Sequence, residues 1–267
     1  MKKLLNYAFM SILLIGLLAA CGQGGNEGEQ ATNTNGGEQE EKKVLKMGTS
    51  ADYPPFEYVD TAKGEEIIGF DVDLAKAVTE KLGYEIEIQD IDFAGLIEAL
   101  KSGRVDLVLA GMSVDEERKN SVDFSDIYYT ANHMVVFKKD ANFTNVEGLA
   151  GKVVGVQTGS IQEEKANEIK ETTEITIESR NRVPEIVQEV KAGRFDAIIV
   201  EDVVGKGYLD KNEDLAGFEL ETDGENGFAV AFPKGSDELV AEFNRVIGEM
   251  KESGELDQLI NKWFGGE

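Results

Sequence analysis

The chain has 267 residues, of which 41% are hydrophobic, and its 52 acidic and 27 basic residues give a formal net charge of -25. This hydrophobic content supports one or two α/β domains with ordinary cores and excludes a wholly disordered chain. The negative charge repels nucleic-acid phosphates, so we expect no nucleic-acid partner. It is typical of a well-solvated surface, and an acidic face for a basic partner is the alternative.

The N-terminus predicts an export signal over residues 1–20. Two lysines precede an apolar stretch from Tyr7 to Ala20 that is too short to span a bilayer comfortably. The stretch ends in Leu-Ala-Ala-Cys-Gly, which resembles a bacterial lipobox and implies a lipid on Cys21. A buried cysteine in a retained membrane helix is the alternative. A disulfide within the chain is excluded because Cys21 is the only cysteine.

Residues 21–43 predict a flexible, lipid-anchored linker. From Gly22 to Lys43 the chain has no aromatic or large aliphatic side chain to bury. Such a segment cannot offset the entropy lost on ordering. The linker would leave the rest of the chain free to dock on a membrane complex.

From Val44 onward, strands and helices alternate in two successive series, and each series follows a βαβαβ plan. Such series predict two Rossmann-like lobes. The first series comprises strands 44–47, 85–89 and 105–109 with helices 70–81 and 93–101. The second comprises strands 152–156, 174–177 and 197–200 with helices 161–170 and 183–191.

Two apolar runs, 134–138 and 228–232, are suited to cross between the lobes as hinge strands. Segments 237–250 and 256–263 have apolar residues at helical spacing and no strand of their own beside them. We expect them to form helices that pack back on the first lobe. We therefore expect lobe 1 to combine 44–133 with 233–267, and lobe 2 to span 139–227. A cleft between lobes, where strand ends and helix N-termini converge, is the usual place for a ligand.

A set of short motifs, in this order, resembles the family-3 extracellular solute-binding proteins of bacteria over residues 44–265. That family serves polar amino acid ABC transporters. The resemblance implies a type II periplasmic-binding-protein fold and capture of an amino acid by lobe closure, with delivery to a permease. The motifs are YPPFEY at 53–58, GFDVDL at 69–74, DFAGLI at 92–97, DEER at 115–118, DFS at 123–125, GVQTGS at 155–160, FPKGS at 232–236 and KWFG at 262–265.

An amino acid ligand needs a cation for its carboxylate. The family motif places this arginine at Arg118, whose guanidinium matches two carboxylate oxygens. A surface arginine paired to a neighbouring glutamate is the alternative. Ser113 would add donors from lobe 1, unless it caps a helix. From lobe 2, Ser160 and the amide of Ile161 begin a helix whose N-terminus favours an anion, although Ser160 could be a plain N-cap.

The ligand ammonium needs an anion. The resemblance implies that Glu201, at the end of strand 197–200, supplies it, and Asp202 is the second choice. The alternative is that Glu201 is an exposed carboxylate in the first turn of the next helix. The carbonyl of Ala110 or Gly111 would complete the ammonium site, because glycine allows close approach of the backbone. Asp71 precedes the first helix, as Asp73 does, and we interpret both as caps.

Tyr53 and Phe93 match the aromatic pair that covers the ligand side chain in this family, although either could instead be a core aromatic. Ser50 stands where relatives with cationic ligands often carry an acid, which favours a polar uncharged amino acid. Asp52, Glu57 and Gln157 lie nearby, so a cationic ligand stays open.

We expect no enzyme activity, no cofactor and no metal. A cyclohexadienyl-dehydratase-like enzyme is the weakest alternative, since His133 is the only histidine and fits a structural role. A calcium-loop-like stretch from Asp210 to Glu221 has Leu215 where that loop needs glycine. A ligand-binding sensor or adhesin of the same fold is the stronger alternative. The expected protein is a monomer at the outer face of the cytoplasmic membrane, held there through Cys21 and working with a membrane permease.

Overall fold

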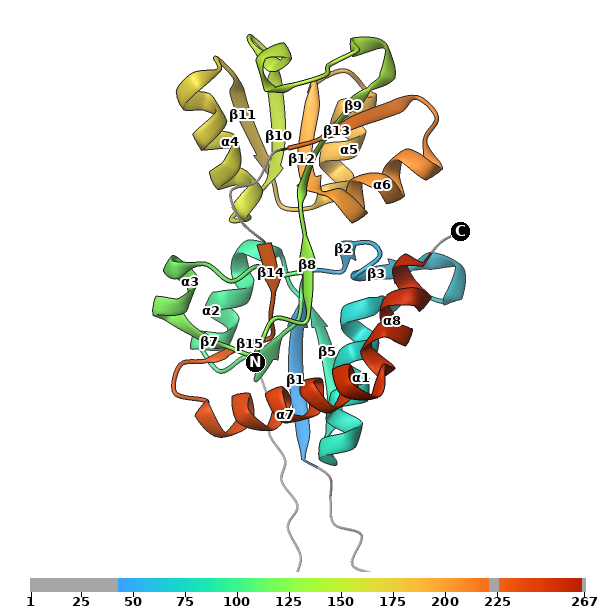
Figure 1. Cartoon of the computed structure of the whole chain (residues 1–267). Helices are drawn as coiled ribbons and strands as arrows, with labels where there is room; N and C mark the ends of the chain where they lie inside the picture. The colour runs from blue at the N-terminus through green and yellow to red at the C-terminus, as the bar shows by residue number, and fades with distance from the viewer. Residues whose placement is uncertain (1–42, 221–225, 266–267) are drawn as a thin grey trace, which may run out of the picture. The chain divides into compact units, whose positions relative to one another are not determined.

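The computed structural model of this chain describes residues 43–220 and 226–265 (Figure 1). The predicted signal 1–20, Cys21 and all but the last residue of the predicted linker lie outside these ranges. Within them, no helix combines the length and hydropathy that a membrane crossing requires. The following description concerns this part of the chain.

Lobe 1 is built on a five-stranded sheet of order β5-β1-β6-β15-β7. β1 is parallel to β5 and β6, whereas β15 runs antiparallel to β6 and β7. A small sheet, β2-β3-β4, is attached beside it. The strands are β1 (Val44–Thr49), β2 (Asp52–Tyr53), β3 (Glu57–Asp60), β4 (Glu66–Ile68), β5 (Glu85–Asp90), β6 (Leu107–Val108), β7 (Val122–Phe124) and β15 (Ala231–Pro233). The helices are α1 (Phe70–Leu82), α2 (Leu96–Lys101), α3 (Glu116–Ser121), α7 (Asp237–Ser253) and α8 (Glu255–Phe264).

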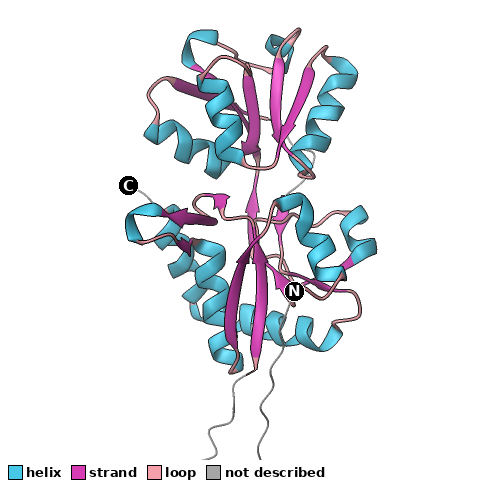
Figure 2. Ribbon diagram, turned by 180° about the vertical axis from the view of Figure 1, so that it is seen from behind, coloured by secondary structure: helices cyan, strands magenta, loops and turns pink. Residues whose placement is uncertain are grey.

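Lobe 2 repeats the plan with a five-stranded sheet of order β11-β10-β12-β9-β13. β10 is parallel to β11 and β12, and β9 is antiparallel to β12 and β13. Figure 2 shows helices flanking both large sheets. The strands are β9 (His133–Lys138), β10 (Val153–Gln157), β11 (Thr176–Arg180), β12 (Ala197–Glu201) and β13 (Leu215–Glu219), and the helices are α4 (Ile161–Thr172), α5 (Val183–Lys191) and α6 (Asp202–Lys211). The predicted α/β fold class, with two Rossmann-like lobes, is confirmed.

The chain passes between the lobes at a pair of antiparallel strands, β8 (Tyr129–Ala131) and β14 (Asn226–Phe228). The sequence placed these connections at 134–138 and 228–232. In the structure, residues 133–138 form β9 inside the sheet of lobe 2, and residues 231–233 form β15 inside the sheet of lobe 1. Residues 134–137 and 231–232 are apolar because they are buried inside the two large sheets. Phe228, the first residue of the second run, is the last residue of the connecting strand β14.

The start of α1 differs from the sequence interpretation. Its N-cap residue is Gly69, with φ 139°, and a Cβ there would lie 2.0 Å from the carbonyl oxygen of Phe56. Asp71 and Asp73 do not cap the helix. Asp71 is fully buried and accepts hydrogen bonds from the amide of Gly111 at 2.8 Å and the hydroxyl of Tyr128 at 2.9 Å. It therefore holds the loop after β6 in place.

Asp73 has a different role, because it joins the C-terminal helix to α1. Its carboxylate accepts hydrogen bonds from Lys262 at 2.6 Å and from the indole of Trp263 at 2.8 Å. Phe264, at the end of α8, stacks on Tyr129 of β8 with ring centroids 4.7 Å apart. The C-terminal helix thus packs on lobe 1 beside the connecting strands.

Candidate functional site

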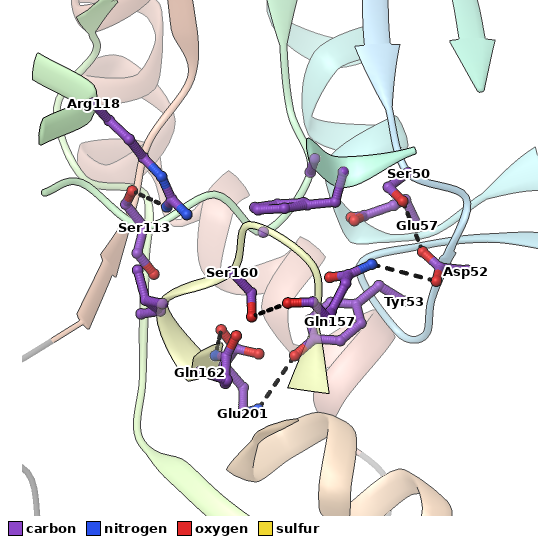
Figure 3. A pocket seen from close by; sticks show the side chains of 14 residues that line it. Ser50, Asp52, Tyr53, Glu57, Ser113, Arg118, Gln157, Ser160, Gln162 and Glu201 are labelled. Carbon is purple, nitrogen blue, oxygen red and sulfur yellow. Dashed lines mark hydrogen bonds between the residues drawn. The ribbon is translucent and has the colours of Figure 1, made fainter. Parts of the chain in front are cut away.

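One pocket lies between the two lobes, where the ends of β1, β6, β10 and β12 converge (Figure 3). Every residue that the sequence predicted to bind the ligand lines it. The lining residues are Ser50, Asp52, Tyr53, Glu57, Phe93, Ala110, Gly111, Ser113 and Arg118 from lobe 1, with Gln157, Ser160, Ile161, Gln162 and Glu201 from lobe 2. Sequence reasoning did not select Gln162, although it directly follows Ile161 in the first turn of α4.

Arg118 is held in α3 and is only 7% exposed. Its Nη1 donates to the carbonyl of Ser113 at 2.7 Å and its Nη2 donates to the carbonyl of Gly159 in lobe 2 at 3.1 Å. Its Nε lies 3.0 Å from Asp115, the N-cap residue of α3. Burial lowers the pKa of Arg118, but a guanidinium keeps its proton at any physiological pH. The pocket therefore contains one fixed, oriented positive charge.

Two further features favour an anion beside Arg118. The hydroxyl of Ser113 is buried and has no hydrogen-bond partner in the described part of the chain. α4 starts at Ile161, so its unpaired N–H groups and the positive end of its dipole face the pocket. Ser160 is the N-cap, since its hydroxyl accepts the amide of Glu163 at 3.2 Å and donates to Gln157 at 2.8 Å. The cap and the pocket position thus coincide in Ser160.

Glu201 ends β12 and is 3% exposed. Its Oε1 accepts a hydrogen bond from the amide of Gln162 at 2.6 Å, whereas its Oε2 is buried without a partner among the described residues. Its own backbone N–H donates to the hydroxyl of Tyr53 at 3.2 Å. Burial raises the pKa of Glu201 to about 8. A cation that reached Oε2 would stabilise the ionised form.

Tyr53 and Phe93 both border the pocket, and both are less than one tenth exposed. The ring of Phe93 lies 5.4 Å from the guanidinium carbon of Arg118, so it packs against that cation. Gly111 has φ +53°, a left-handed conformation, and a Cβ there would lie 3.6 Å from the ring of Tyr53. A larger residue would be strained at this position and would narrow the pocket.

A second group of acids lies at the other end of the pocket from Arg118, as Figure 3 shows. Asp52 is 7% exposed and accepts hydrogen bonds from the hydroxyl of Ser50 at 2.9 Å and the amide of Val183 in lobe 2 at 2.7 Å. Burial raises its pKa to about 6. Gln157 approaches the same carboxylate at 3.5 Å.

Glu57 is completely buried, and neither of its oxygens receives a hydrogen bond in the described part of the chain. Burial, followed by the charges of Asp71 and Asp52, raises the pKa of Glu57 well above its usual range. Burial also raises the pKa of Asp71 to about 7. These two carboxyls are hydrogen-bonded to each other when Glu57 is protonated. At neutral pH the pair therefore shares a proton, which a cation placed beside Glu57 would displace.

The lobes also touch outside the pocket. Arg182, just before α5, donates to Asp90 at 2.8 Å and to Asp92 at 2.7 Å in lobe 1. Asn181 donates to Asp92 at 2.9 Å. Gly159 has φ +74°, and a Cβ there would lie 3.2 Å from that of Ala94 across the cleft. Contacts outside the pocket, to residues 90–94 of lobe 1, thus also hold the lobes together.

The described part of the chain has few side chains that could support catalysis or metal binding. His133 begins β9, is 4% exposed, and has its pKa lowered to about 4, chiefly by burial. No group of three or more His, Cys, Asp or Glu in residues 43–220 and 226–265 is arranged to hold a metal ion. The calcium-loop-like stretch consists of the end of α6 and then β13 over residues 210–219.

Comparison with known proteins gives a consistent result. Residues 45–266 match the model for "Bacterial extracellular solute-binding proteins, family 3". The chain is 52% identical over 252 residues to the "Arginine-binding extracellular protein ArtP" of Bacillus subtilis, covering 94% of this chain and 93% of that protein.

Solved structures agree. The crystal structure of the substrate-binding protein of an amino acid ABC transporter superposes with a TM-score of 0.80 at 45% identity, covering 84% of this chain and 100% of that one. An ancestral arginine-binding protein bound to arginine gives a TM-score of 0.79 at 37% identity, covering 84% of this chain and 99% of that one.

Proposed function

The chain belongs to the bacterial extracellular solute-binding proteins, family 3, and from this premise we propose that it captures a cationic amino acid, arginine first, and delivers it to an ABC importer. The observation that carries the proposal is the charge balance of the pocket. Three buried carboxyls, those of Asp52, Glu57 and Glu201, line it together with one guanidinium, that of Arg118.

An uncharged amino acid would satisfy only two of these groups. Its carboxylate would pair with Arg118 and its ammonium with Glu201, and no cation would then reach Glu57. A ligand with a cationic side chain supplies that third charge. The positions of the charged groups fit such a ligand. Arg118, for the ligand carboxylate, lies at one end of the pocket, and Glu57, for the cationic side chain, lies at the other (Figure 3).

Arginine suits the acidic end better than lysine. A planar guanidinium has five N–H donors, and this end offers two unpartnered oxygens of Glu57 and a third carboxylate acceptor in Asp52. The resemblance to an arginine-binding extracellular protein at 52% identity supports the same choice. The proposal departs from the preference for an uncharged ligand that we drew from Ser50, because Glu57 lies in the same pocket.

Glutamine is the second candidate. The proton shared by Glu57 and Asp71 makes Glu57 a neutral hydrogen-bonding group at neutral pH, which is compatible with a side-chain amide. Ser50 and Gln157 beside it are also uncharged. The two candidates differ in what they require of Glu57, since only arginine needs its negative charge.

The test compares arginine, lysine, ornithine, histidine and glutamine by titration calorimetry on residues 22–267, after unfolding and refolding to remove bound ligand. Arginine should bind most tightly, and at 100 times its Kd it should add about 2.7 kcal/mol to the free energy of unfolding. Glu57→Gln should weaken arginine binding about 100-fold, because it removes the buried carboxylate whose two oxygens are otherwise unpartnered. Glu116→Gln is the matched control, since that side chain is 89% exposed. Tighter binding of glutamine than arginine would reject the proposal.

The alternatives to transport need separate assays. We propose that the protein binds its ligand without converting it, so arginine recovered from the complex should be chemically unchanged. A sensor or adhesin would bind equally well but would not support uptake. Deletion of the gene should therefore abolish accumulation of labelled arginine, and unimpaired uptake would favour one of those alternatives.

The attachment to the membrane is part of the same proposal. We propose that the signal 1–20 is removed, that Cys21 is lipidated and that residues 21–43 tether a monomeric domain at the outer face of the membrane beside its permease. Labelled palmitate should enter the wild type but not the Cys21→Ser variant, which should be released into the medium. Labelling of both proteins would contradict the assignment.

A further inference from the structure

His133, Gln162 and Glu201 form a buried polar row that the binding proposal does not use in full. β9 and β12 are antiparallel neighbours, and their register pairs His133 with Glu201. Gln162 comes from α4, and the three side chains are 4%, 5% and 3% exposed. One nitrogen, Nε2 of Gln162, lies 2.6 Å from Oε1 of Glu201 and 3.3 Å from Nδ1 of His133.

The chemistry of the amide fixes the state of the histidine. The NH2 group of Gln162 has two hydrogens, so it can donate to Glu201 and His133 at once. The second bond requires Nδ1 of His133 to be an acceptor, and the imidazole must then be neutral with its proton on Nε2. A protonated ring would present Nδ1–H to the amide, which would have to rotate and withdraw its donor from Glu201.

The surroundings keep the ring neutral at physiological pH. Burial is the largest cause and lowers the pKa of His133 to about 4. The charged groups that act on the ring from its neighbours are Lys165, which lowers the pKa further, and Glu168 and Asp202, which oppose it. Glu201, which the strand register pairs with His133, contacts the same Gln162 nitrogen. The ring is therefore neutral at any pH above about 5, which leaves Nδ1 able to accept the hydrogen bond from Gln162.

We propose that Gln162, oriented by His133, is a positioning residue that holds Oε1 of Glu201 so that Oε2 faces the ammonium of the ligand. The inference rests on the proposed function, in which Glu201 binds that ammonium. Oε2 is the carboxylate oxygen left buried without a partner in the described part of the chain, and Glu201 lines the pocket. If the carboxylate of Glu201 rotated freely, ligand binding would have to fix it in one orientation, and the entropy lost would lower the affinity for the ligand.

The first experiment separates positioning from general support of the fold. Gln162→Leu keeps the volume of the side chain and removes both donors. It should raise the Kd for arginine about tenfold or more, because a hydrogen bond to a charged group is lost. The Kd for 5-guanidinopentanoate, which is arginine without its α-amino group, should change less than about twofold because that ligand has no ammonium to place. Equal weakening of both ligands would overturn the proposal.

Variants of His133 provide the conservative rescue. His133→Leu removes the acceptor and should weaken arginine binding as Gln162→Leu does. His133→Asn places an amide oxygen near the position of Nδ1 and should bind arginine within about threefold of the wild type. Failure of His133→Asn to rescue, in a variant that unfolds like the wild type, would contradict a positioning role.

The tautomer of His133 can be read without any ligand, because the chain has one histidine. Nitrogen-15 NMR of the wild type at pH 7 should show a neutral ring with the proton on Nε2. A proton on Nδ1 in a protein that still binds arginine would overturn this inference and leave the proposed function intact. A wild type that binds no cationic amino acid would remove the premise, and the inference with it.

Discussion

Arg182→Ala tests whether contacts between the lobes contribute to affinity without touching the ligand. Arg182 is not among the residues that line the pocket, and it makes two charged hydrogen bonds across the cleft, to Asp90 and Asp92. Its side chain is 23% exposed, and those of its partners are 39% and 46% exposed. Partly exposed pairs contribute about 0.5–1 kcal/mol each, so the two together stabilise the closed form by about 1–2 kcal/mol.

In a protein that is largely open without ligand, this whole amount appears in the Kd. Arg182→Ala should therefore raise the Kd about 5- to 30-fold. The factor should be the same for arginine and for a weaker ligand such as lysine, because the lost bonds do not involve the ligand. Titration calorimetry of both ligands measures it. Arg245→Ala is the control, since it breaks a pair inside α7 whose side chains are 56% and 57% exposed. An unchanged Kd, or a loss confined to one ligand, would refute the reasoning.

Two further predictions concern pH and packing. Burial raises the pKa of Glu201 to about 8 and of Asp52 to about 6, so the free protein holds protons that a cationic ligand must displace. Affinity for arginine should thus fall as the pH drops from 8 to 6. Calorimetry in two buffers of different ionisation enthalpy should show that binding releases protons. If binding at pH 7 released no protons, these pKa directions would be contradicted. In the core of lobe 2, Gly155→Ala should destabilise by about 1–3 kcal/mol, because its Cβ would lie 2.3 Å from Ile186. Gly207→Ala, in α6 with open space around it, should stabilise by about 0.5–1 kcal/mol. Urea titration of each variant measures both changes in the free energy of unfolding.

The sequence identified the pocket residues that follow directly from strand ends and motif positions. Glu201 and the start of α4 lie at the ends of elements that were predicted from local periodicity. Arg118 was located by the family motif instead, and it lies in α3, a helix that the sequence analysis did not predict. The tertiary contacts of the pocket residues are harder to predict from the sequence. Asp71 lies in the first turn of a helix, where capping is the local expectation, yet its partner Gly111 is 40 residues away. No local pattern predicts that contact.

The acidic end of the pocket shows the same limit. Ser50 pointed to an uncharged ligand because one position was considered by itself. In the structure, the β2–β3 pairing sets Tyr53 opposite Glu57, which brings that carboxyl into the pocket. Asp52 meets the amide of Val183, 131 residues away, only because the lobes approach each other. The position of these carboxyls in the pocket thus depends on tertiary contacts that a residue-by-residue comparison does not contain.

In the proposed function, binding and closure are linked, because Arg118 and Glu201, which are proposed to hold the ligand, also make contacts between the lobes. Arg118, from lobe 1, donates to Gly159 of lobe 2 at 3.1 Å, and Tyr53, from lobe 1, accepts the amide of Glu201 in lobe 2 at 3.2 Å. A ligand that engages Arg118 and Glu201 together therefore needs both lobes in place. A ligand that engages only one of them gains fewer contacts from the opposite lobe and favours the closed form less strongly. In the proposed function, the contacts that select the ligand would therefore also set the closed shape that a permease recognises.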